Sequence, residues 1–160
     1  MTSLATPKNK DGLALNEFLC FSLYSAGHAF NQFYRPLLDK IGLTYSQYLV
    51  MVALWSKDGQ MVKELGQALF LESNTLTPML KRLERLGYID RSRDPNDERQ
   101  VRVGLTEEGR ALRAQAASIP ECVLEATGIS SGDLRRIQAE MAAIRDRLLA
   151  VSFRRFGRLL

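Results

Sequence analysis

Residues 73–105, SNTLTPMLKRLERLGYIDRSRDPNDERQVRVGL, change their pattern midway, and this change indicates the fold. Up to Gly87, apolar residues recur every three or four positions, which is typical of an amphipathic helix beginning between Ser73 and Thr75. From Tyr88 on, the runs YIDRSRD and RQVRVGL alternate apolar and polar residues on either side of a charged tip, DPNDE. Such a pattern predicts a β-hairpin. The stretch is therefore expected to be a helix followed by a hairpin.

The residues before this stretch predict three further helices. Val62–Leu69 is a short amphipathic segment, and residues 44–59 form a longer one that ends at Gly59. Residues 13–39 carry apolar side chains at three- and four-residue steps and predict one long helix. The side chains of the second helix that are expected to face inward are Tyr45, Tyr48, Leu49, Val52, Leu54 and Trp55.

The residues after the hairpin predict two more helical segments. Thr106 can cap the run TEEGRALRAQAASIPECVLEATG, which is interrupted near Pro120 and closed by Gly128. Ser130 or Ser131 then caps a last long helix. The expected fold is mainly α, with a small β-hairpin wing.

Two short helices joined by a tight turn and followed by a hairpin form a winged helix-turn-helix lobe, here over residues 44–105. The helix that starts near Ser73 would enter the major groove of DNA. Its small polar side chains can approach base edges or phosphates, and its basic ones suit phosphate contacts. Pro78 must lie near the first turn of this helix or kink it. The predicted DNA-binding residues are Ser73, Asn74, Thr75, Thr77, Pro78, Lys81, Arg82, Arg85, Arg91, Arg93, Asp97 and Arg99.

Arg99 at the hairpin tip is the candidate for insertion into the minor groove. Asp97 stands two residues earlier, so its carboxylate is expected to hold the guanidinium in place. Arg91, Arg93 and Arg102 would surround it. Taken singly, these features also fit a solvated amphipathic helix and a basic surface, but their combination favours DNA. The formal charge of +4 fits a polyanionic partner without requiring one.

The composition, 46% hydrophobic and 25% charged over 160 residues, is that of an ordinary globular chain. Residues 1–12 are polar and are expected to form a flexible tail before a single domain, residues 13–160. Without a secretion signal or a long apolar run, the expected location is the cytoplasm, with no membrane contact. Cys20 and Cys122 are then expected to be reduced at rest. One histidine and two distant cysteines offer no zinc ligand set, so neither a metal nor a cofactor is predicted.

Cys20 and the tyrosines after it form a second informative pattern. Tyr24 lies one helical turn from Cys20 on the same face, where its phenol can reach the sulfur. Tyr34 returns to nearly the same face but about 21 Å along the axis, so it can approach Cys20 only from a second copy of the chain. Two such helices crossing about a two-fold axis would make the site a property of a homodimer. Alternatively, Cys20 is a small buried hydrophobe.

Residues 62–110 resemble the DNA-binding lobe of the MarR family of dimeric repressors. The run LCFSLYSAGHAFNQFYRPLLDKIGLTYSQYLVMVALW more narrowly resembles the organic-hydroperoxide-sensing branch of that family, OhrR. The resemblance implies that Cys20 senses peroxide and that the helices of residues 13–39 and 107–160 build the dimer. The tyrosines that it places around the cysteine are Tyr24, Tyr34 and Tyr45.

The same resemblance bears on Cys122. This branch has one-cysteine and two-cysteine types, and in the second type the resolving thiol lies in the penultimate helix of the other subunit, the region of Cys122. A sulfenic acid at Cys20 can condense with a second thiol, so an intersubunit disulfide is expected. The alternative is that Cys122 is a packed thiol too distant to react. The bridge would rotate the winged lobes and spoil their spacing on a palindromic operator.

The sequence therefore predicts a redox-sensing repressor and not an enzyme. It would bind operator DNA as a reduced homodimer and dissociate when an organic hydroperoxide oxidises Cys20. No Lys, Arg or His lies within one turn of Cys20, so hydroxyl donors must stabilise the thiolate. Two alternatives are a repressor that responds to a non-covalent aromatic ligand and a thiol peroxidase that uses Cys20 and Cys122.

Overall fold

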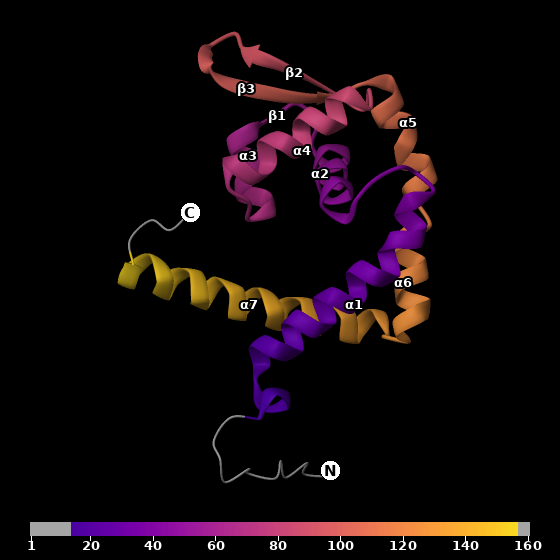
Figure 1. The fold of residues 1–160 in the computed structure, drawn as a ribbon, viewed down its shortest axis with the longest axis vertical. Helices are drawn as coiled ribbons and strands as arrows, with labels where there is room; N and C mark the ends of the chain where they lie inside the picture. The colour runs from indigo at the N-terminus through magenta and orange to yellow at the C-terminus, as the bar shows by residue number, and fades with distance from the viewer. Residues whose placement is uncertain (1–13, 157–160) are drawn as a thin grey trace. The chain divides into compact units, whose positions relative to one another are not determined.

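The computed structural model describes residues 14–156, and side chains as far as Ser152. The chain divides between Tyr45 and Ser46 into two compact units, whose elements are labelled in Figure 1. The predicted flexible tail, residues 1–12, lies outside the described residues. Among the helices that the structure describes, none is long and apolar enough to cross a membrane.

The first unit consists of a 3-10 turn, η1 (Leu15–Glu17), and the helix α1 (Leu19–Asp39). The prediction of one helix over residues 13–39 is wrong at its start, because the backbone of Phe18 is extended (φ −88°, ψ 119°). The carbonyl oxygen of Phe18 accepts the first two N–H bonds of α1 at 3.1 Å each. Cys20 is consequently the second residue of α1 and lies in its first turn.

Three helices confirm the predicted helical part of the lobe: α2 (Tyr45–Ser56), α3 (Val62–Leu69) and α4 (Ser73–Arg85). The bounds of α3 agree with the prediction, whereas α2 ends before Gly59. The side-chain amide of Gln60 donates to two carbonyl oxygens near this end, at 3.0 and 2.7 Å. These bonds tie Gln60 back to the last turn of α2 and to Lys57 just after it, although the Ala53 carbonyl oxygen also accepts the N–H of Lys57.

The core of the second unit is formed by leucines of the helices together with apolar residues of the sheet. In α2, Val52 is 40% exposed, while Val50 and Met51 are fully buried, so the predicted inward face is wrong at Val52. A helix that is apolar on nearly all sides gives no reliable face from its pattern. The largest fully buried side chains of this unit are Val50, Met51, Leu54, Leu65, Leu76, Leu80, Leu83, Ile89 and Val103.

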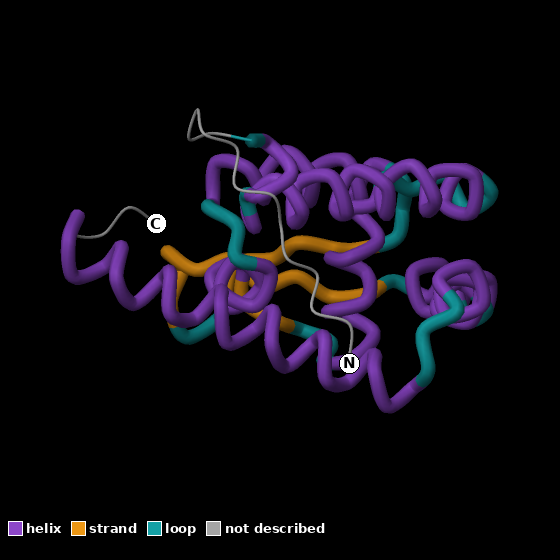
Figure 2. Tube along the Cα trace, turned by 90° about the horizontal axis from the view of Figure 1, so that it is seen from below, coloured by secondary structure: helices purple, strands orange, loops and turns teal. Residues whose placement is uncertain are grey.

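The predicted hairpin belongs to an antiparallel sheet of three strands in the order β1-β3-β2, seen as the orange strands of Figure 2. The strands β2 (Ile89–Asp94) and β3 (Asp97–Leu105) leave only Pro95 and Asn96 between them, a shorter tip than predicted. The added strand, β1 (Gln60–Met61), pairs with β3. Its two residues are too few for an alternating pattern to be recognised.

The predicted helices after the hairpin are confirmed as α5 (Glu107–Ala116), α6 (Ile119–Thr127) and α7 (Ser131–Phe156). The Thr106 hydroxyl accepts the N–H of Gly109 at 3.0 Å and caps α5 as expected. Gly128 ends α6 in the left-handed region, at φ +63°. Of the two candidate serines, Ser130 caps α7, since its hydroxyl accepts the N–H of Asp133 at 3.1 Å.

Candidate DNA interface and thiol site

The turn between α3 and α4 sets the direction of α4, the helix predicted to read DNA and called the reading helix below. Phe70 closes α3 in the left-handed conformation (φ +54°), and the Leu71 N–H donates to the Gly66 carbonyl oxygen at 2.9 Å. A Cβ on Gly66 would lie 2.9 Å from the backbone oxygen of Leu71, so a side chain there would force the turn apart. Beyond the turn, α4 buries a stripe of leucines, which leaves its opposite face exposed.

That exposed face of α4 carries most of the predicted DNA-binding side chains. Pro78 lies inside α4, beyond its first turn, because the helix already begins at Ser73. The expectation that it lies near the first turn is therefore wrong, and the carbonyl oxygen of Asn74 loses its helical N–H donor. Thr77 is half-buried. The exposed residues are Ser73, Asn74, Thr75, Pro78, Lys81, Arg82 and Arg85.

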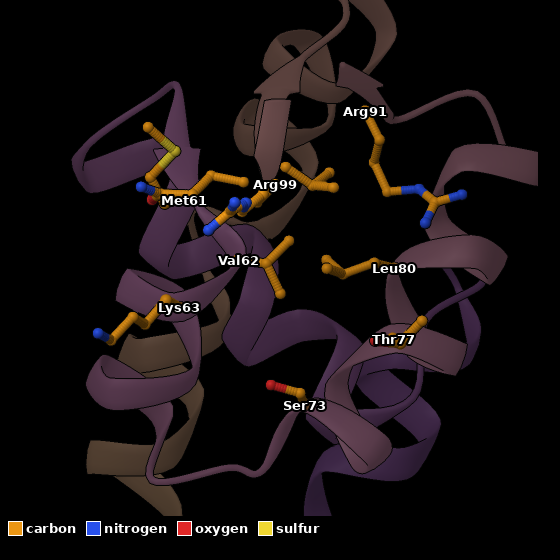
Figure 3. Close-up of a pocket in the computed structure, with 10 residues that line it drawn as sticks. Met61, Val62, Lys63, Ser73, Thr77, Leu80, Arg91 and Arg99 are labelled. Atoms are coloured by element: carbon orange, nitrogen blue, oxygen red, sulfur yellow. The ribbon is translucent and has the colours of Figure 1, made fainter. Parts of the chain in front are cut away.

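A groove of about 510 Å³ runs between α3, α4 and the wing (Figure 3). Ser73 and Thr77 line it from α4, and Arg99 lines it from β3. Lys63, in the first turn of α3, also lines the groove, although the sequence did not suggest it as a site residue. A single lysine on a short helix resembles any solvated charge, and only the packing of α3 beside α4 reveals its position. The groove therefore connects α4 with the wing, and polar and basic side chains lie along it among apolar ones.

Arg91 lies in the wing, but its charge is paired within the lobe. Its guanidinium donates to Oε2 of Glu84 on α4 at 2.6 and 3.0 Å, and its side chain is only 24% exposed. The hydrogen bond from Arg91 holds the pKa of Glu84 below its usual range. The pair therefore fastens β2 to α4. Because Arg91 also lines the groove, its predicted contact with DNA stays a prediction.

A second ion pair joins Asp94, at the end of β2, to Arg102 in β3. Asp94 is buried, and the Arg102 guanidinium donates to its Oδ2 at 2.6 and 3.2 Å. The same guanidinium also donates to the carbonyl oxygen of Gly59. The hydrogen bond from Arg102, followed by that from the Asn96 N–H, holds the pKa of Asp94 below its usual range. Arg102 therefore links the wing to the segment that precedes β1.

At the tip of the wing, Asp97 does not hold Arg99 in the way that the sequence suggests. The Asp97 carboxylate accepts the backbone N–H of Arg99 at 3.1 Å and the side-chain amide of Gln100 at 3.0 Å. Arg93 donates to the backbone oxygen of Glu98 at 3.1 Å. Among the described residues, no ion pair engages the Arg99 guanidinium, so it remains available to a phosphate or a minor groove.

Cys20 is exposed in the first turn of α1. Tyr24, 69% exposed, has its ring between those of Phe21 and His28, with centroids 6.4 and 6.3 Å away. Within the described part of the chain, no hydrogen bond joins the Tyr24 hydroxyl to the sulfur. The predicted contact therefore stays a prediction.

Tyr34 and Tyr45 are brought together near the other end of α1. Their ring centroids lie 4.8 Å apart at an angle of 54°, and burial raises the pKa of the Tyr45 hydroxyl. A tyrosine hydroxyl is protonated at neutral pH, and the raised pKa extends the range over which Tyr45 can act as a donor. These two tyrosines form a pair at one end of α1, while Cys20 lies in the first turn at the other.

Cys122 lies on α6 in the second unit, where it is a half-buried free thiol. Over residues 14–152, the structure contains no group of three His, Cys, Asp or Glu side chains that could hold a metal ion. The redox roles of Cys20 and Cys122 stay predictions from the sequence.

The family model described as transcriptional regulator SarA/Rot matches residues 32–115. Over 138 residues, the chain is 41% identical to the organic hydroperoxide resistance transcriptional regulator of Bacillus subtilis, covering 86% of this chain and 94% of that protein. The chain belongs to the organic-hydroperoxide-sensing branch of the MarR family. As a member of this branch, it is a redox-responsive, DNA-binding transcriptional repressor with a winged-helix fold.

Other relatives place this MarR-family chain among regulators of the same kind. It is 46% identical over 140 residues to the regulator TtmR of Methylorubrum extorquens, covering 88% of this chain and 72% of that protein. Reduced AbfR bound to DNA matches with a TM-score of 0.70 at 37% identity, covering 82% of this chain and 92% of that one. AbfR comes from Staphylococcus epidermidis. Its disulfide form matches with a TM-score of 0.57 at 36% identity over 83% and 88% of the two chains.

Proposed function

We propose that a homodimer of the reduced chain represses transcription by binding a palindromic operator, and that an organic hydroperoxide releases it by oxidising Cys20. The observation that carries this proposal is the exposure of Cys20 on a helix whose apolar face is also exposed. Leu19 is 55% exposed, and Phe30 and Phe33 are more than one-third exposed. Because large apolar side chains in such a row mark an interface, we expect a second copy of α1 to cover them. The repressor would act in the cytoplasm, where its operator lies.

The position of Cys20 suits attack on a peroxide. The first turn of a helix has backbone N–H groups without intrahelical acceptors, and it favours negative charge. The thiolate attacks the outer oxygen of the hydroperoxide, so that an S–O bond forms as the O–O bond breaks. Sulfur is oxidised by two electrons to the sulfenic acid, and the alkoxide takes up a proton and leaves as an alcohol. Tyr24, with Tyr34 and Tyr45 of the second copy, would stabilise the charged sulfur by donating hydrogen bonds.

Cys122 of the second copy is proposed as the resolving thiol. Its sulfur would attack the sulfenic acid at Cys20, forming the S–S bond and releasing water. The existence of a disulfide form of the relative AbfR supports this step. Drawing α6 of one copy toward α1 of the other would change the spacing of the two reading helices, so they would no longer fit both half-sites.

We further propose that the chain regulates and does not turn over peroxide as an enzyme. A thiol peroxidase needs a positioned group that activates the peroxide, and no Lys, Arg or His lies within one turn of Cys20. The relatives TtmR and the Bacillus subtilis protein are transcriptional regulators. Enzymic turnover of hydroperoxide with a dithiol reductant would contradict this proposal.

The test is to measure binding of the reduced protein to its own promoter DNA before and after one equivalent of cumene hydroperoxide. Non-reducing gels are run on the same samples, and Cys20→Ser and Cys122→Ser are compared with the wild type. We expect the wild type to lose binding and form a dimer band that a dithiol reverses. Cys20→Ser should bind DNA and no longer respond, whereas Cys122→Ser should form no band.

Each other result has a distinct meaning. Release without the dimer band would remove Cys122 from the mechanism and leave oxidation of Cys20 as the signal. Unchanged binding by the oxidised wild type would overturn the redox proposal and favour a non-covalent aromatic ligand, to which Cys20→Ser would still respond.

A further inference from the structure

A second cavity lies within the first unit and is independent of the DNA-binding groove. It has a volume of about 400 Å³ and is formed where α1 ends and α2 begins. The lining residues on which the inference rests are Asn31, Arg35, Leu38, Leu43 and Tyr45. A volume of this size lies within the usual range for small-molecule pockets.

The chemistry of this cavity is that of an apolar site with a cation at its edge. Leu38 and Leu43 are 1% and 4% exposed, so the floor is apolar and packed. Arg35 is exposed, and among the described residues no ion pair engages its guanidinium, although Asp39 also lines the cavity one turn later. Asn31 uses one of its two side-chain N–H groups for the Gly27 carbonyl oxygen, at 3.0 Å. Arg35 carries the only positive charge among the described residues that line the cavity, so its guanidinium is the strongest donor for a ligand.

Tyr45 supplies a second donor and connects the cavity with the tyrosine pair. Its hydroxyl is protonated at neutral pH, and burial raises its pKa further. Its ring lies 4.8 Å from that of Tyr34. A guanidinium binds a carboxylate through two parallel hydrogen bonds, and an adjacent phenol can add a third. An apolar floor with these donors matches a molecule that has a carboxylate on an alkyl or aromatic body.

We propose that this cavity binds the carboxylate of an amphipathic hydroperoxide through Arg35, with Tyr45 as the second donor. This inference rests on the proposed function, because Tyr34 and Tyr45 are there expected to adjoin Cys20 of the second copy. A ligand held at Arg35 would carry its O–O bond next to the sulfur that it oxidises. The chain therefore discriminates a fatty-acid hydroperoxide from its uncharged ester.

The experiment compares the rates at which a fatty-acid hydroperoxide and its methyl ester oxidise the reduced full-length protein, both below their micelle concentrations. The wild type is expected to react faster with the acid, and Arg35→Gln should lose about tenfold with the acid alone, as expected for lost hydrogen bonds to a charged group. The matched control, Lys40→Gln, removes a positive charge at the end of α1 that does not line the cavity, and it should keep the preference. Equal rates for acid and ester in the wild type would overturn the inference while leaving peroxide sensing intact.

A second measurement separates failure of the cavity from failure of the proposed function. Binding of the corresponding non-oxidising hydroxy fatty acid to Cys20→Ser is measured by calorimetry, with and without Arg35→Gln. Binding that weakens about tenfold on loss of Arg35 supports the cavity even if no hydroperoxide oxidises Cys20. Absence of binding, or binding that does not depend on Arg35, would overturn it.

Discussion

Gly109 has no room for a side chain, because the backbone of α5 lies against the start of the hairpin. A Cβ at this position would lie 1.9 Å from the carbonyl oxygen of Tyr88. The Trp55 indole N–H donates to the Gly109 carbonyl oxygen at 2.8 Å and holds α5 close to α2. Gly109→Ala is therefore expected to lower the free energy of unfolding by about 3 kcal/mol or more.

Denaturant unfolding measures this effect, with Gly132→Ala as the matched control. The nearest atom to a Cβ on Gly132 is 3.8 Å away, so this variant should unfold close to the wild type. Equal stability of the two variants would show that α5 can shift without losing its packing.

Asp94 is expected to make the stability of the protein depend on pH. Its folded-state pKa lies below its usual range because of the hydrogen bonds from Arg102 and the Asn96 N–H. A depressed carboxyl pKa contributes stability that is present above the unfolded pKa of about 3.9 and is lost as the pH falls through the folded value. Asp94→Asn should therefore be less stable than the wild type at pH 7, and the difference should shrink below about pH 4. Thermal unfolding across this range checks it, and a constant difference would contradict the assignment.

At the scale of the elements, the wing contains two kinds of arginine. Both Arg99 and Arg91 line the groove, but Arg91 is paired with Glu84, whereas Arg99 has no ion-pair partner among the described residues. Arg99→Gln should weaken DNA binding. It should also make the slope of log K, the DNA association constant, plotted against log salt concentration less steep by about 1. Arg91→Gln should instead lower the melting temperature and leave that slope unchanged. A smaller slope for Arg91→Gln would mean that this arginine contacts phosphate after all.

At the scale of the whole molecule, the proposed function depends on a second copy of the chain. Leu19 is 55% exposed in the first turn of α1, and in the proposed dimer this face is covered. Leu19→Glu would bury a charge there and should convert the dimer to a monomer with weakened operator affinity. Sedimentation velocity and DNA titration test this, with Val52→Glu as the control, because Val52 is 40% exposed on α2, outside the helices expected to build the dimer. A Leu19→Glu dimer of unchanged affinity would place the interface elsewhere.

Much of the fold was predictable because its signals are local. The bounds of α3, the Thr106 cap and the closing Gly128 follow from periodicity and from residues next to each helix end. The strand β1 was missed because its pairing of Gln60 with Val103 joins distant parts of the chain. The break at Phe18 was missed because the apolar spacing continues through it, although the backbone does not.

The sequence by itself determined the winged lobe, the exposed polar face of α4 and the spacing of Cys20 from its tyrosines, since residue type and helical period encode all three. Only the tertiary structure decided which charged side chains form ion pairs and which do not. It pairs Arg91 with Glu84 and Arg102 with Asp94, and it leaves Arg99 and Arg35 without ion-pair partners in the described chain. The physical reason is that an ion pair depends on which side chains the packing brings within 4 Å, and residues far apart in the sequence meet only when the elements pack.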